Sequence, residues 1–79
     1  LELNAFRGIN SLKGLDLEKN QIKFLNPYQF VNLKNLEWIN LRVNNIEIIQ
    51  ANTFVGLESL NDLDFDTNII SYIESDGFK

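Results

Sequence analysis

The sequence contains no cysteine and no histidine. Without cysteine the chain can form neither a disulfide nor a zinc–cysteine centre. Without both residues the commonest nucleophile–base pairs of enzymes are missing, and no glycine-rich phosphate loop is present to bind a nucleotide. We therefore predict that the protein is not an enzyme and that it uses no cofactor.

Long apolar runs and positive charge are also scarce. No apolar run approaches the roughly 18 residues that cross a bilayer, so we predict no membrane span and no direct membrane contact. Seven Lys and Arg stand against eleven Asp and Glu, for a net charge of -4. Nucleic acids and anionic membranes call for clustered basic residues, so this balance argues against both as partners. An apolar content of 44% in 79 residues indicates one small folded module.

The chain does contain an internal repeat of 24 residues. Three segments align without a gap at that shift: LKGLDLEKNQI, LEWINLRVNNI and LNDLDFDTNII, at 12–22, 36–46 and 60–70. The residues between them align as well, in apolar columns formed by Phe6, Phe30, Phe54 and Phe78, by Leu1, Leu25, Ile49 and Ile73, and by Ile9, Leu33 and Leu57. We interpret the chain as a partial repeat at 1–11 followed by repeats at 12–35, 36–59 and 60–79.

The shared pattern, L-x-x-L-x-L-x-x-N-x-I, resembles the leucine-rich repeat family. The likeness is closest to the 24-residue class with Phe in its second half, as in Toll-like receptors, insect immune leucine-rich proteins and lamprey variable lymphocyte receptors. Departures are mild, since Phe65 replaces a strand leucine and no capping repeat is visible. Because the chain begins midway through a repeat, we expect an internal fragment of a longer solenoid.

The resemblance implies an α/β repeat solenoid, wound as a right-handed superhelix. A parallel β-sheet would line its concave face, and turns or short helices its convex face. An extracellular or cell-surface location is also implied. The sequence has no N-x-S/T glycosylation site and no capping cysteine, so an intracellular location stays open.

The second copy illustrates how such a repeat would pack. Ile39 and Leu41 point to one side of a short strand, because strand side chains alternate between two faces. We expect the core of this copy to contain Leu36, Ile39, Leu41, Ile46, Phe54 and Leu57. One repeat cannot bury this set alone, so neighbouring repeats must stack at the strand spacing of about 4.8 Å.

An asparagine column, Asn20, Asn44 and Asn68, follows the predicted strands. A sharp turn at that point leaves backbone groups unpaired inside the stack, and an Asn side chain can both donate to them and accept from them. The family resemblance implies a structural ladder of buried asparagines. The alternative is that these asparagines merely occupy turns and form no such ladder.

The opposite wall is less regular. The segment NPYQF at 26–30 has an Asn suited to a cap, a Pro suited to the first helical position and a Gln three residues after the Asn. It predicts a single helical turn. In ESDGF, at 74–78, Gly77 weakens a helix, so we expect turns mixed with short helical pieces.

Trp38 falls in a column with Gly14 and Asp62, and a column that accepts Gly, Trp and Asp does not belong to the core. We therefore expect Trp38 on the outer face of the sheet. An exposed Trp in a polar surround is a frequent binding hot spot. The alternative is that its ring folds over neighbouring strand residues and merely covers them.

The outward columns predict a binding surface for a protein partner with a basic, partly apolar patch. Its candidate residues are Trp38, Asn40, Arg42, Val43, Asp62, Asp64 and Asp66. A solvated acidic face that keeps the protein soluble is the alternative for the aspartates. They resemble the start of a calcium loop, but Thr67 stands where that loop needs Gly and Ile73 where it needs Glu, so we predict no metal site.

Two functions remain open at this stage. The chain is either a ligand-binding part of an extracellular receptor or innate-immunity protein, or a set of structural spacer repeats in a longer array whose binding surface lies elsewhere.

Overall fold

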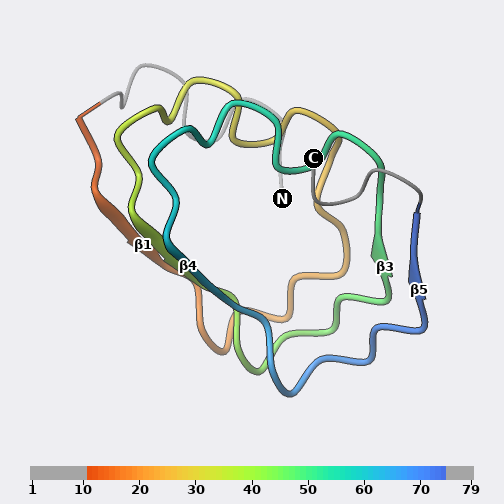
Figure 1. Cartoon of the computed structure of the whole chain (residues 1–79). Coiled ribbons are helices and arrows are strands. Elements are labelled where there is room, and N and C mark those ends of the chain that lie inside the picture. The colour runs from red at the N-terminus through yellow and green to blue at the C-terminus, as the bar shows by residue number, and fades with distance from the viewer. Residues whose placement is uncertain (1–10, 75–79) are drawn as a thin grey trace.

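The computed structural model describes residues 11–74, which wind into a coil with two small parallel sheets on its opposite sides (Figure 1). The first sheet has three strands in the order β1 (Gly14–Asp16), β2 (Trp38–Asn40) and β4 (Asp62–Asp64). The second sheet pairs β3 (Ile48–Ile49) with β5 (Tyr72–Ile73). We call residues 12–35 coil 1, residues 36–59 coil 2 and residues 60–74 coil 3. Coil 1 contains β1, coil 2 contains β2 and β3, and coil 3 contains β4 and β5.

Both sheets pair residues that lie 24 positions apart, which is the period of the sequence. Gly14 lies beside Trp38, and Trp38 beside Asp62, while Ile48 lies beside Tyr72. Backbone hydrogen bonds continue this register past the strand ends, for example from the Leu17 amide to the Asn40 carbonyl at 2.8 Å. The predicted parallel sheet is confirmed.

The core lies between the two sheets and is most complete in coil 2. Leu36, Ile39, Leu41 and Ile46 are all at most 1% exposed, so the predicted alternation of the β2 segment is confirmed. Phe54 is buried too, and Leu57 packs against the core from a half-buried position. Phe30 and Phe54, from neighbouring coils, stack with parallel rings 6.0 Å apart.

The helical turn expected at 26–30 is wrong. Residues 27–32 form turns, and no helix occurs anywhere in residues 11–74. Tyr28 has a φ of 62°, which a right-handed helix does not allow. Its amide donates instead to the Asn52 carbonyl of the next coil, at 2.8 Å. The wall between the sheets is therefore built from turns, and the helical part of the α/β expectation is corrected.

Some predicted positions lie outside the described residues. These are the apolar positions Leu1, Phe6, Ile9 and Phe78, together with Gly77. Within the described part of the chain, no helix is long and apolar enough to span a membrane.

Candidate functional site

Trp38 stands on the outer face of the three-stranded sheet and leans over the neighbouring strand. Its side chain is 43% exposed. A Cβ atom placed on Gly14 would overlap atoms of the indole ring, so the ring lies directly over this glycine. The sequence left two arrangements open, a ring exposed on the outer face or a ring folded over its neighbours. The structure combines them, because the ring covers its neighbour in β1 and still presents surface to solvent.

A shallow hollow lies beside the ring on the same face. Its volume is about 290 Å³, and it is lined by Asp16, Trp38, Ile39, Asn40, Asp62 and Asp64. Asp16 and Asp62 are exposed, whereas Asn40 and Asp64 are half-buried. The hollow thus joins an aromatic surface to three carboxylates, which matches the chemistry of a basic side chain.

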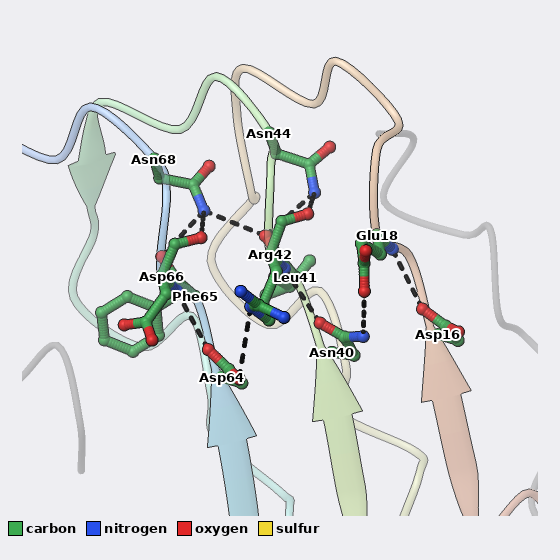
Figure 2. Close-up of polar contacts among 10 residues, drawn as sticks. All are labelled: Asp16, Glu18, Asn40, Leu41, Arg42, Asn44, Asp64, Phe65, Asp66 and Asn68. Carbon is green, nitrogen blue, oxygen red and sulfur yellow. Dashed lines mark hydrogen bonds and ion pairs between the residues drawn. The ribbon is translucent and has the colours of Figure 1, made fainter.

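The last residue of each strand in this sheet uses its side chain to end the strand. Oδ1 of Asp16 accepts the amide of Glu18, and Oδ1 of Asn40 accepts the amide of Arg42, at 3.1 and 3.0 Å (Figure 2). Asp64 accepts the Asp66 amide in the same way, at 3.1 Å. These are Asx turns, which explains why this column contains only Asp and Asn.

Two further contacts tie these strand ends to one another. Nδ2 of the Asn40 side chain donates to Oε1 of Glu18 at 2.9 Å. Nε of Arg42 lies 3.7 Å from Oδ2 of Asp64, and both side chains are nearly half exposed. An ion pair this open to water contributes little stability, so Arg42 remains available to a partner.

The asparagine column forms hydrogen bonds between coils (Figure 2). Oδ1 of Asn44 accepts the amides of Asn20 and Ile22 in coil 1, at 3.0 and 2.9 Å. Its Nδ2 donates to carbonyls in both coils, those of Leu17, Leu41 and Arg42. Asn68 repeats the arrangement one coil later, accepting from Ile46 and donating to Leu41.

Burial differs along this column. Asn44 is 6% exposed, Asn68 is half-buried and Asn20 is exposed. Nδ2 of Asn20 donates to the Glu18 carbonyl at 3.1 Å. The middle residue therefore has the most complete set of backbone partners.

In each coil, the residue directly before the asparagine of this column has a left-handed backbone conformation. Lys19, Val43 and Thr67 have φ values of 60°, 56° and 59°. Valine and threonine are β-branched, and such residues adopt this conformation only under strain. Val43 is 37% exposed, and its amide donates to the Asp66 carbonyl of the next coil at 3.1 Å, which holds the turn in this conformation.

The predicted site residues do not all meet. Trp38, Asn40, Asp62 and Asp64 line the hollow, and Arg42 lies beside Asp64. Val43 and Asp66 are exposed on the turns beyond the strand ends and do not line it.

Two residues that sequence reasoning did not select belong to this face. Gly14 makes room for the indole ring, and Asp16 lines the hollow from β1. The signal was available, because both align with selected residues of β2 at the 24-residue shift. Among the residues described, no group of three or more Asp or Glu is placed to hold a metal ion.

Comparisons with known proteins add one match. A sequence model of the family described as leucine rich repeat matches residues 1–46, which is more than half of the chain. Searches of curated proteins and of solved structures found no match to the chain.

Proposed function

The chain belongs to the leucine-rich repeat family, whose modules generally bind other proteins, and we propose that it does so through the outer face of its three-stranded sheet. The partner presents a basic residue next to an apolar one. One observation carries this proposal: the half-exposed Trp38 ring borders a hollow that also contains the carboxylates of Asp16, Asp62 and Asp64.

The charges and the aromatic ring of this face support this choice of partner. Lys or Arg can stack on an indole face by a cation–π interaction while pairing with a carboxylate beside it. Asp64 already accepts the Asp66 amide and lies near Arg42, so it is held in place. Asp62 is exposed and stands next to Trp38 in the paired register, which makes it the freer partner for a cation.

The test uses random peptides displayed on phage and selected against the immobilised 79-residue chain. We expect the selected peptides to contain Arg or Lys next to an apolar residue. Trp38→Ala and Asp62→Lys should each weaken their binding at least tenfold, because one removes the ring and the other reverses a charge in the hollow. Tyr28→Asn is the control, since it removes an aromatic side chain exposed to 47% on another side of the molecule. Selected peptides that bind both sheet variants as well as the original chain would refute the proposal.

We also propose that the repeats wind as a right-handed superhelix with this sheet on its concave side, in an extracellular receptor or innate-immunity protein. The support is the 24-residue period with its Phe column, which resembles the repeats of such proteins, and the pairing of strands at that same period. The repeat boundaries at 12–35, 36–59 and 60–79 belong to the same proposal.

A spacer role is the second candidate, and the Asx turns favour it. Asp16, Asn40 and Asp64 all use a side-chain oxygen to end a strand, so part of the polar surface serves the fold rather than a ligand. A spacer predicts that Asn44→Ala destabilises the chain while Trp38→Ala and Asp62→Lys change no binding of the selected peptides. The two roles therefore differ in the response to the sheet variants.

A further inference from the structure

A second column of outward residues runs through β3 and β5 and continues at the equivalent position of coil 1, and it is apolar in all three coils. Phe24 is 65% exposed, Ile48 45% and Tyr72 59%. Ile48 and Tyr72 pair directly in the ladder of β3 and β5, and Phe24 occupies the equivalent position of coil 1. We call these three residues the apolar column.

The outward residues of the apolar column differ from those on the face that carries Trp38. There the outward positions change from Gly to Trp to Asp, whereas here each coil exposes a large apolar side chain. Contiguous exposed apolar surface is costly in water and marks an interaction site. The apolar column also lines a hollow of about 490 Å³, which is large enough for one or two large side chains.

Charges of both signs flank the apolar column on one side. Lys23 of coil 1 and Glu47 of coil 2 precede Phe24 and Ile48, line the same hollow and are exposed. They are 24 residues apart and so occupy the same column of neighbouring coils. Neither has an ion-pair partner within residues 11–74.

We propose that this face binds a second copy of the same chain. A two-fold axis along the strands, midway between coils 1 and 2, places Lys23 of each copy opposite Glu47 of the other. The same axis lays Phe24 of one copy over Ile48 of the other, and the reverse. Glu74 of coil 3 also lines the hollow, but it lies beyond the two paired coils, and its Oε1 accepts the Ala51 amide at 3.3 Å. Within coils 1 and 2 the patch has an apolar centre with one charge of each sign beside it, and such a patch is complementary to itself, which is what a two-fold interface requires.

The size of the patch predicts a weak dimer. In this arrangement Phe24 and Ile48 of each copy meet, and Tyr72 lies beyond the paired coils. An aromatic side chain buries about 150–250 Å², so this contact falls well below the roughly 800 Å² per partner of a standard interface. Association should therefore appear in the micromolar to millimolar range rather than at nanomolar concentration.

The test is sedimentation velocity of the 79-residue chain over that concentration range, with charge-swap variants. Lys23→Glu and Glu47→Lys each turn two attractive pairs of the dimer into two repulsive ones, so each should weaken self-association about tenfold. An equimolar mixture of the two variants should regain it, because a mixed dimer has two attractive pairs again. Both side chains are exposed, so neither variant depends on a change in the core.

A second pair of variants tests the apolar contact. Ile48→Asp should abolish self-association, and Tyr28→Asn should leave it unchanged, because Tyr28 is exposed outside this face. Trp38→Ala should also leave it unchanged, which separates this proposal from the binding role of the other sheet. A chain that stays monomeric throughout, or one whose association survives both charge variants and Ile48→Asp, would overturn the proposal.

Discussion

Replacing Asn44 by Ala tests the element that joins the coils. The side chain of Asn44 bonds five backbone groups: the amides of Asn20 and Ile22 and the carbonyls of Leu17, Leu41 and Arg42. The bonds to the Ile22 amide and the Leu41 carbonyl are buried. Alanine removes all five bonds and offers no replacement.

The magnitude follows from the two buried groups. Each buried donor or acceptor left without a partner costs about 1–3 kcal/mol, whereas the more exposed groups can bond water. We expect a loss of about 3 kcal/mol or more. A chain of this length has about 4–12 kcal/mol of stability in total, so the loss is a large share of it. The melting temperature should fall by about 10–25 °C.

Urea and thermal unfolding, followed by circular dichroism and by Trp38 fluorescence, measure this loss. Asn45→Ala is the matched control, because it makes the same chemical change one residue later at an exposed side chain and should stay within about 0.5 kcal/mol. The loss should decrease in the order Asn44, Asn68, Asn20, following burial. If Asn44→Ala and Asn45→Ala had equal effects, the hydrogen-bonded ladder would not be what holds the coils together.

Four further substitutions probe the sheet face and its turns. Gly14→Ala should push the indole of Trp38 off β1, and since this is the single Trp of the chain, its emission should shift to the red; an unchanged spectrum would contradict the packing of the ring on Gly14. Val43→Asn should stabilise the chain by about 1 kcal/mol in urea unfolding, because Asn tolerates the left-handed backbone; destabilisation would contradict strain at this turn. Asp64→Ala should cost about 1 kcal/mol through loss of its Asx turn, and Arg42→Ala less than about 0.5 kcal/mol; the reverse order would mean that the ion pair matters more than the turn.

Val31→Asn is the control for the valine substitution. Val31 is 39% exposed, close to the 37% of Val43, but its φ is not positive. Since no strain is relieved there, we expect no gain in stability.

The repeat made much of the fold predictable. A period of 24 residues assigned Ile39 and Leu41 to the core and Trp38 to the outside, because a strand alternates and a column must suit every coil. The same reasoning predicted parallel pairing, since stacked coils run in one direction. These predictions depend only on periodicity and burial, which a sequence displays directly.

The turn at 26–30 was not predictable in the same way. The contact expected between Asn26 and Gln29 is present, because Oε1 of Gln29 accepts the Asn26 backbone amide at 3.2 Å, as in a capping box. No helix follows, since Tyr28 takes a positive φ and its amide bonds Asn52 of the next coil. A contact 24 residues away decided the local structure, and local sequence signals do not report it.

The outer face of the three-stranded sheet was assigned correctly from the sequence, but the contacts within it were not predicted. Asn40 and Asp64 were selected as outward polar residues, and the structure adds that each ends its own strand. The position of the indole over Gly14 depends on a side-chain torsion that no repeat pattern encodes. The apolar column with Phe24 and Ile48 was visible at the same shift of 24 but does not belong to the sheet that carries Trp38.

The most direct test of the proposed function is a heteronuclear NMR titration of the chain with an Arg- or Lys-containing peptide from the display selection. The single indole N–H of Trp38 gives one resonance, and we predict that it shifts together with the backbone signals of β1, β2 and β4. Signals of β3 and β5 should stay in place, because they lie on the opposite side of the coil (Figure 1). Bound peptide that leaves the Trp38 indole unshifted, or that shifts only β3 and β5, would contradict a binding site on the three-stranded sheet.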